Sequence, residues 1–275
     1  MSGPFQLQVE GGIGRLTLGN AALKNALGRS FFSEFGKALR RLDESGECRV
    51  LVINSSGPHF CSGIDLSFLG DPTLINTGSA LDREKLRRLI LALQEPISAL
   101  AAVRFPVIAA CQGASLGAAV DLLSACDLRF ATNDAYFVIE EINIGLMADL
   151  GSLQRLPGAL PDAIVREMAF TGLPLDSQRA LSLGFVNGVL DDYAALMTRV
   201  DEVAQLIASR APLAVAASKQ ALNYNRSHST ADSLDYAATL QAAIIDPASV
   251  AASVMARKLK EGSASFENLS SDFAL

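Results

Sequence analysis

The sequence contains no tryptophan, two histidines and only 19% charged residues, although half of its 275 residues are hydrophobic. With His59 and His228 alone, a histidine-rich metal site or a Ser-His-Asp triad has little material. The cysteines form no CxxC pair, so they indicate reduced core residues of an intracellular protein: Cys48, Cys61, Cys111 and Cys126. These counts disfavour a metal centre, a disulfide framework and histidine-dependent nucleophilic catalysis.

The net charge and the apolar segments limit the classes of partner that the chain is expected to bind. A net charge of −6 argues against nucleic acid, because phosphate neutralisation needs clustered Lys and Arg, although one basic patch could still hold a ligand's phosphates. The opening residues MSGPFQLQVEGG lack a basic region followed by an apolar one, so no secretory signal is predicted. The longest helical apolar stretch, 89–103, is interrupted by Gln94, Glu95 and Pro96 and is too short to cross a bilayer. We expect a soluble, cytoplasmic protein with no membrane partner.

The first part of the chain alternates between strand-like and helix-like segments. Period-two alternation predicts a hairpin of residues 5–9 and 13–18, and almost wholly apolar runs predict buried strands at 49–53 and 105–111. Two further short strands are expected at 128–131 and 136–139. Helices are expected at 31–44, with Ser30 as the N-cap, at 82–103 and at 118–126.

From Pro161 onward the pattern becomes mainly helical. The expected helices are 162–171, 176–183, 192–209, 211–224 and 229–261. No low-complexity linker separates the two parts. The sequence therefore predicts an α/β core over residues 1–195 and a helical C-terminal region over residues 196–275.

Three carboxylates lie among residues that should be buried. Asp121 stands in an apolar helical run, Glu141 follows a strand-like segment, and Asp149 lies shortly before a glycine. Burying a carboxylate without a partner costs several kcal/mol of folding free energy or raises the pKa of the group. Acids in such places therefore often take part in proton transfer. Taken singly, Asp121 could pair with a Lys or Arg, Glu141 could be a loop acid, and Asp149 could be an N-cap. The combination favours one shared pocket.

Two glycine-bearing loops follow buried strands. They are His59–Leu66, HFCSGIDL, and Gly113–Ala118, GASLGA, and the second leads into a helix N-terminus. Small residues let the backbone approach a ligand closely, and unpaired N–H groups at a helix start favour an oxyanion. Two such N–H groups could form an oxyanion hole for an enolate. A pair of ordinary tight turns is the structural alternative.

These motifs make the chain resemble the crotonase, or enoyl-CoA hydratase/isomerase, superfamily over Phe5 to Glu261. The resemblance is carried by NAALKNAL, HFCSGIDL, PVIAACQGASLGAAVDLLSACDLRFAT, EEINIGLMADLGSLQRLP, LPLDSQRALSLGFVNGVL and SKQAL. It implies an α/β spiral of repeated ββα units, a helical C-terminal trimerisation region, and a homotrimer or homohexamer. The implied substrate is an acyl-CoA thioester.

The resemblance also implies site residues. It places the oxyanion-hole N–H groups at Ile64 and Ala118, although many members have three glycines where this chain has Gly117-Ala118-Ala119. The substrate-binding positions that it implies are Lys24, Ala26, Ser62, Gly63, Asp65, Leu66 and Gly117. Candidates for the CoA phosphates are Lys24, Arg257 and Lys258, because the common C-terminal ending of some relatives is missing here.

The acids resemble one subgroup of this superfamily. Hydratases place glutamates at the positions of Asp121 and Glu141 and usually a glycine at Asp149, whereas the spacing of 20 and 8 residues matches the dienoyl-CoA isomerases. The implied reaction converts a 3,5-dienoyl-CoA into a 2,4-dienoyl-CoA. Glu141 and Asp149 would transfer the protons, Asp121 would tune or orient them, and no metal or redox cofactor would be required.

Other readings stay open on the sequence alone. A 2-enoyl-CoA hydratase could use Asp121 and Glu141. Another acyl-CoA lyase, hydrolase or isomerase of the superfamily, or a non-catalytic acyl-CoA-binding member, would share the same motifs. Acyl chain length and pathway are not predicted.

Overall fold

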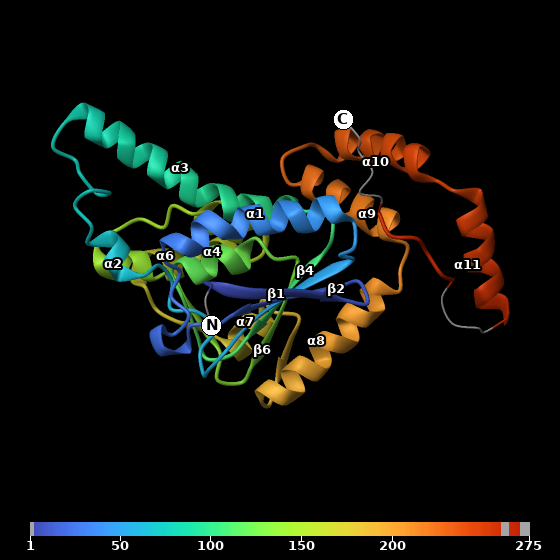
Figure 1. Cartoon of the computed structure of the whole chain (residues 1–275), viewed down its shortest axis with the longest axis horizontal. Helices are drawn as coiled ribbons and strands as arrows, with labels where there is room; N and C mark the ends of the chain where they lie inside the picture. The colour runs from blue at the N-terminus through green and yellow to red at the C-terminus, as the bar shows by residue number, and fades with distance from the viewer. Residues whose placement is uncertain (1–2, 260–263, 270–275) are drawn as a thin grey trace.

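Two sheets form the centre of the computed structural model, which describes residues 3–259 and 264–269 (Figure 1). The larger sheet has the strand order β1-β2-β3-β4-β6-β9, and the smaller has the order β5-β7-β8. The strands are β1 (Phe5–Glu10), β2 (Ile13–Leu18), β3 (Val50–Ser55), β4 (Val107–Cys111), β5 (Ala114–Leu116), β6 (Leu128–Thr132), β7 (Tyr136–Val138), β8 (Leu175–Asp176) and β9 (Gly188–Leu190).

The chain winds as a spiral, and from β4 to β7 consecutive strands alternate between the two sheets. β1 and β2 form the expected antiparallel hairpin, with Phe5 opposite Leu18. The pairs β2–β3, β3–β4, β4–β6 and β6–β9 are all parallel. While β4 and β6 pair in the large sheet, β5 and β7 pair in parallel in the small one. The expected crotonase-like spiral of strand pairs and helices is therefore confirmed.

The large sheet is buried on both faces, which explains its nearly continuous apolar strands. Alternate residues of β3 face opposite cores: Leu51 and Ile53 point to the larger one, and Val50 and Val52 to the smaller. The larger core is covered by α1 (Arg29–Ser45), α3 (Ala80–Ala102) and α4 (Ala118–Ser124). The smaller core lies under α8 (Tyr193–Ala208), on the opposite side of the sheet in Figure 1.

Short helices surround these layers. They are η1 (Ala21–Leu23), α2 (Leu66–Leu69), η2 (Glu140–Ile144), α5 (Ser152–Arg155), η3 (Leu156–Gly158), α6 (Asp162–Thr171) and α7 (Ser177–Ser182). The predicted helix at 162–171 is confirmed as α6. The predicted Ser30 cap is wrong, because α1 begins at Arg29 and its N-cap is Gly28.

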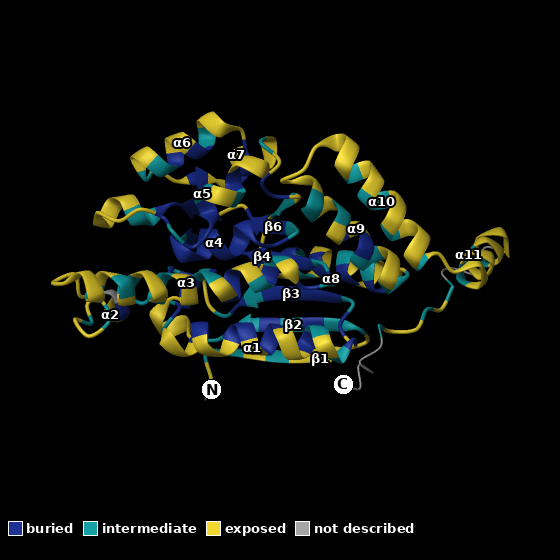
Figure 2. Ribbon diagram, turned by 90° about the horizontal axis from the view of Figure 1, so that it is seen from above, coloured by how far each residue is buried: buried dark blue, intermediate teal, exposed yellow. Residues whose placement is uncertain are grey.

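The C-terminal helices are α9 (Pro212–Asn225), α10 (Thr230–Ile244) and α11 (Pro247–Leu259). Helices α10 and α11 reach away from the sheets, and Figure 2 colours them mostly exposed. The prediction of a single helix over 229–261 is therefore wrong, because α10 and α11 are separate helices bent by 87° from one another. Pro247 explains the break, since proline disfavours helical backbone at the residue before it. Residues 260 and 261 lie outside the described residues.

The predicted division at residue 195 remains a prediction. Helix α8 crosses it, and its buried side chains Leu196, Val200 and Ala204 pack on the sheet. Among residues 3–259 and 264–269, no single helix meets the length and hydropathy needed to span a bilayer, and α10 with α11 does so only as a bent pair.

Candidate active site

Two loops that lie far apart in the sequence are joined by backbone hydrogen bonds. The Cys61 N–H donates to the Ala114 carbonyl over 3.1 Å, and the Leu116 N–H donates to the Cys61 carbonyl over 3.0 Å. Gly63 adopts φ +88°, and a Cβ there would lie 2.6 Å from the Leu116 carbonyl oxygen. Only glycine therefore allows the two backbones to come this close.

These loops bring the Ile64 and Ala118 N–H groups to the same cavity. Ala118 is the first residue of α4, so its N–H has no acceptor within the helix. The residues on either side of Ile64 bond to Leu27: the Leu27 N–H donates to the Gly63 carbonyl, and the Asp65 N–H donates to the Leu27 carbonyl. The Ile64 N–H has no acceptor among the described residues. The site of a Gly63 Cβ is only 3.4 Å from the Ala118 nitrogen, which shows how near the loops lie. The arrangement suits an oxyanion hole.

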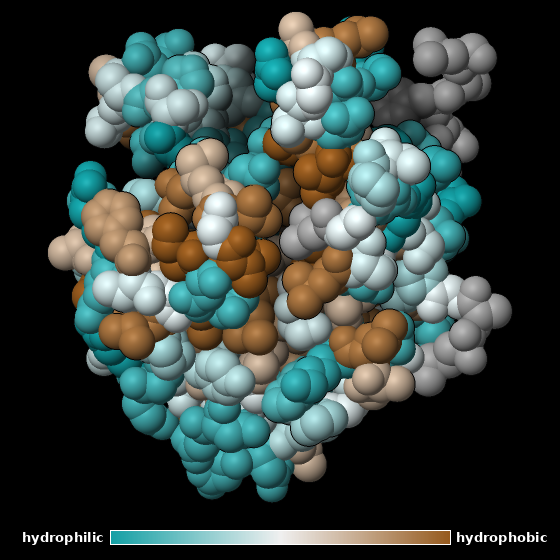
Figure 3. All heavy atoms as spheres, turned by 90° about the vertical axis from the view of Figure 1, so that its left-hand side faces the viewer, coloured by the Kyte–Doolittle hydropathy of each residue, from teal (hydrophilic) through white to brown (hydrophobic). Residues whose placement is uncertain are grey.

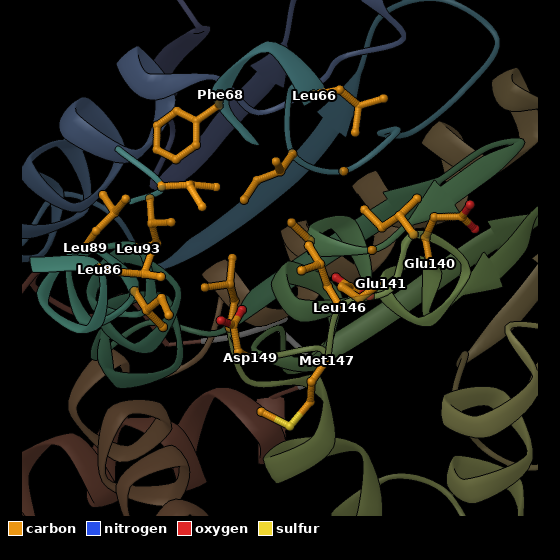
Figure 4. A pocket seen from close by; sticks show the side chains of 18 of the residues that line it. Leu66, Phe68, Leu86, Leu89, Leu93, Glu140, Glu141, Leu146, Met147 and Asp149 are labelled. Atoms are coloured by element: carbon orange, nitrogen blue, oxygen red, sulfur yellow. The ribbon is translucent and has the colours of Figure 1, made fainter. Parts of the chain in front are cut away.

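The cavity beside these groups encloses about 290 Å³ and is mainly apolar (Figure 4). Helix α3 contributes Leu86, Leu89, Ile90 and Leu93, which are spaced as one helical face. The other apolar walls come from α2 and the loops on either side of it, and from the end of η2 and the segment that follows: Ile64, Leu66, Phe68, Ile75, Ile144, Leu146, Met147 and Leu150. Such a lining fits an acyl chain rather than a polar ligand.

Part of this lining reaches the molecular surface. Hydrophobic side chains gather on the end of the molecule that carries α2 and the start of α3 (Figure 3). Leu66 is 67% exposed and Met147 68% exposed, although both line the cavity. The cavity is therefore entered through an apolar rim.

Glu141 lies directly beside the second loop. A Cβ on Gly117, whose φ is +52°, would be 3.1 Å from Glu141 Oε1. The other carboxylate oxygen, Oε2, is buried and has no hydrogen-bond partner among the described residues. Burial, and then the charge of Asp121, raise the pKa of Glu141 to about 7. A carboxyl with that pKa can accept or donate a proton near neutrality.

Asp149 reaches the cavity from the loop that precedes α5. It is half-buried, and burial raises the pKa of its carboxyl. Its carbonyl accepts a 2.6 Å hydrogen bond from Gln94 Nε2 on α3, so the backbone that carries the acid is fixed to that helix. The N-cap of α5 is Gly151, so Asp149 does not cap this helix. In Figure 4 the Asp149 side chain lies between Glu141 and the α3 leucines.

Asp121 lies behind the cavity wall rather than in its lining. It is fully buried on α4, its Oδ1 accepts the Ser152 N–H over 2.5 Å, and its Oδ2 has no partner among the described residues. Burial raises the pKa of Asp121 to about 6, although the bonds from Ser152 lower it. Asp121 therefore supports the start of α5 and acts on Glu141 through its charge.

Some expected site residues do not line this cavity. Ser62, Gly63, Leu66 and Gly117 line it, and their contact with substrate stays a prediction. Ala26 and Asp65 instead line a separate polar hollow, where Asp65 caps α2 through the Ser67 N–H. Lys24 is exposed and supports the first loop through its carbonyl, which accepts the Ser62 N–H.

Sequence reasoning missed Asn25, whose side chain holds the start of the His59–Leu66 loop. Asn25 has φ +57°, is 2% exposed, and donates to the Ser56 and His59 carbonyls over 2.8 and 3.0 Å. Asparagine tolerates left-handed backbone better than most residues, so its place in the LKNAL motif was the available signal. Gln94 and Arg155 were also missed, and only the folded chain brings them to the acids.

Comparison with known proteins agrees with this geometry. Residues 8–267 match the family model described as enoyl-CoA hydratase/isomerase. The chain is 39% identical over 239 residues to the peroxisomal Delta(3,5)-Delta(2,4)-dienoyl-CoA isomerase of Arabidopsis thaliana, covering 86% of each. It is 36% identical to the mitochondrial protein of that name from Rattus norvegicus, over 88% of this chain and 75% of the relative.

Solved structures show the same fold. An enoyl-CoA hydratase from Polaromonas sp. JS666 superposes with a TM-score of 0.84 at 28% identity, over 96% of this chain and 99% of the other. One from Bacillus anthracis gives a TM-score of 0.86 at 23% identity, over 96% and 98%.

Proposed function

The chain belongs to the enoyl-CoA hydratase/isomerase family, and we propose that it converts 3,5-dienoyl-CoA into 2,4-dienoyl-CoA. The observation that carries the proposal is that Glu141 and Asp149 both line one apolar cavity beside two unused N–H groups. The relatives named dienoyl-CoA isomerases, at 39% and 36% identity, support it.

In the proposed reaction the thioester oxygen accepts hydrogen bonds from the Ile64 and Ala118 N–H groups. Removing a proton from C2 places negative charge on that oxygen and, through the conjugated double bonds, on C4 and C6. The two N–H groups, aided by the N-terminus of α4, stabilise this trienolate. Protonation at C6 then yields the 2,4-diene. The substrate gains and loses one proton, so the step needs no electron acceptor.

Two acids are needed because the exchanged protons lie at opposite ends of a five-carbon unit. Glu141 lies against Gly117, next to the proposed oxyanion hole, so we assign it to C2. Asp149 is fixed to α3, whose leucines form the wall for the acyl chain, so we assign it to C6. Glu141 begins as the carboxylate and Asp149 as the acid, and after each turnover Glu141 releases its proton to solvent while Asp149 takes one from solvent.

Asp121 has a supporting role in this proposal. It does not line the cavity, and its unpartnered Oδ2 keeps a negative charge close to Glu141. That charge raises the proton affinity of Glu141, which makes Glu141 a stronger base. The same position weakens the hydratase alternative, since that mechanism requires Asp121 to reach the substrate.

The other expectations from the sequence remain part of the proposal. Lys24, Arg257 and Lys258 are candidates for the CoA phosphates, and Ser62, Gly63, Leu66 and Gly117 for contact with the acyl thioester. A homotrimer or homohexamer is supported by the exposed apolar side chains of α10 and α11, such as Leu234 and Met255. The cytoplasmic placement gains no support from the relatives, whose names say peroxisomal and mitochondrial.

The test is to offer 3,5-dienoyl-CoA and 2-enoyl-CoA to the same preparation. The proposal predicts a rise in conjugated-thioester absorbance with the first substrate and much slower water addition to the second. Fast hydration without isomerisation would establish the hydratase alternative instead.

A further inference from the structure

Arg155 lies beside the acid cluster without lining the cavity. Its guanidinium folds back over Gly151: Nη1 fills the space in which a Cβ on Gly151 would stand. Gly151 has φ +129°, a backbone conformation that L side chains rarely adopt. The turn after Asp149 is therefore shaped to receive this one arginine.

The two ends of the guanidinium join the acid-bearing loop to α3. Nη1 donates to the Leu150 carbonyl over 3.3 Å, and Nη2 donates to Ser98 Oγ on α3 over 3.0 Å. The neighbouring Asp149 carbonyl is held by Gln94, also from α3, and the Ser152 N–H is held by Asp121. Consecutive backbone groups of this loop are thus fixed from α3 on one side and from α4 on the other.

The charges around this loop are strongly unbalanced. Asp121 is surrounded by Asp149 from the loop before α5 and by Glu141 from η2, with Glu140 beyond, while Arg155 is the cation that acts on it from α5. Arg155 uses its hydrogen bonds on neutral oxygens, so its charge remains available to the acids. Arg226, which follows α9, is a second cation near Arg155.

We propose that Arg155 is a positioning residue of the proposed isomerase: it holds the Asp149 loop against α3 and places a positive charge next to the loop that Asp121 binds behind the cavity. The catalytic part of this inference rests on the proposed function. The electrostatic part does not, because it concerns Asp121 in the free protein.

Removing the charge has a defined direction. A nearby cation favours the carboxylate, so without Arg155 every acid of the coupled cluster binds its proton more tightly. The proton on Asp121 is then lost at higher pH. The acid limb of kcat/KM, which requires Glu141 as a carboxylate, also moves to higher pH.

The experiment compares Arg155→Gln, which removes the charge, with Arg155→Lys, which keeps it but cannot donate to Leu150 and Ser98 as a fork. Arg166→Gln, on the exposed face of α6, is the matched control. Aspartate carboxyl carbons are labelled with ¹³C and titrated by NMR in the free protein, and the Asp121 signal is identified by its loss in Asp121→Asn. The pH profile of isomerisation is measured on the same preparations.

We expect Arg155→Gln to shift the Asp121 titration and the acid limb upward by about half a pH unit or more. Arg155→Lys and Arg166→Gln should keep both near the wild-type positions, while Arg155→Lys lowers kcat by ~10-fold through the loosened loop. An unshifted Asp121 titration in Arg155→Gln overturns the inference.

Two results separate this inference from the proposed function. A wild-type protein that forms no 2,4-dienoyl-CoA refutes the function, while the NMR titration still decides the charge role of Arg155. If Arg155→Gln does not fold, Arg155→Lys still tests the positioning role: an unchanged kcat in that variant would refute it.

Discussion

Two aspartates six positions apart, the buried Asp121 and the half-buried Asp127, differ in how their carboxylates are paired. Asp127 Oδ2 accepts the Val107 N–H over 2.8 Å and the ammonium group of Lys219 over 2.8 Å, and Lys219 also donates to the Phe105 carbonyl. Asp121 Oδ2 has no partner among the described residues, and neither does Glu141 Oε2. The Asp127 carboxylate therefore has a cation and a backbone N–H as partners, whereas Asp121 and Glu141 each keep a buried oxygen without a partner among the described residues.

The difference in pairing distinguishes a carboxylate with a structural role, Asp127, from carboxylates that can take part in proton transfer. The Asp127–Lys219 pair joins α9 to the first residue of β4, Val107. Loss of the pair should therefore reduce stability and leave the cavity intact. The acids at the cavity keep unpaired oxygens in an apolar setting, where raised pKa values suit proton transfer near neutral pH. The variants below test whether stability and activity divide in this way.

The largest effect is expected from Asp149→Asn, which keeps the size of the side chain and removes its titratable proton. Diene isomerisation should fall by ~10²–10⁴, the usual contribution of a positioned acid or base. Stopped-flow absorbance with 3,5-dienoyl-CoA measures it, and Asp192→Asn, at the N-cap of α8, is the control because asparagine also caps. Full isomerase activity in Asp149→Asn would reject the two-acid mechanism.

Ala118→Pro tests the oxyanion hole without touching an acid. Proline is accepted at the first position of a helix, so α4 should still form while one N–H is lost. The isomerisation rate should fall by ~10²–10³. Ala119→Gly leaves the N–H in place and controls for changes in the turn; wild-type activity in Ala118→Pro would show that this N–H plays no part.

Lys219→Met tests the anchoring pair. It leaves the half-buried Asp127 carboxylate without its cation, so the free energy of unfolding should drop by about 2 kcal/mol. Urea denaturation measures this, and kcat of the folded fraction should stay within about twofold, since the pair lies outside the cavity. A loss of kcat with unchanged stability would reverse the assigned roles.

Glu141→Gln should lower activity and yet raise stability at alkaline pH. The folded-state pKa of Glu141, about 7, lies above its ordinary value of 4.5, so the folded chain binds more protons between these values and stability falls as pH rises through them. Glutamine removes this penalty, worth on the order of 3 kcal/mol at pH 8 and little at pH 4. Equal stability changes at both pH values would mean that Glu141 is not destabilised by its charge.

Much of the fold could be predicted from local patterns. The hairpin, the buried strands and α6 follow from periodicity and capping, and the loops around Ile64 and Ala118 follow from glycine placement. The break at Asp246 was also readable, since proline disfavours helical backbone at the preceding residue. The expected helix failed there because the apolar periodicity was followed through the proline.

The supporting contacts could not be predicted, because they join segments far apart in the chain. Gln94 reaches Asp149 across 55 positions, and Arg155 reaches Ser98 across 57. The sequence likewise placed Asp121 among the catalytic acids, but only packing of α4 against α5 shows that it stands behind the cavity. Hydrophobic periodicity identifies which face of a helix or strand is buried, but it does not identify which other segment packs against that face.

The most direct measurement is isomerisation of 3,5-dienoyl-CoA in D₂O, with the product examined by NMR. Two acids that exchange with solvent should give 2,4-dienoyl-CoA with deuterium at C6 and one hydrogen lost from C2. Transfer of the substrate's own proton to C6, without deuterium, would contradict the two-acid account. A product hydrated at C3 would contradict the proposed reaction itself.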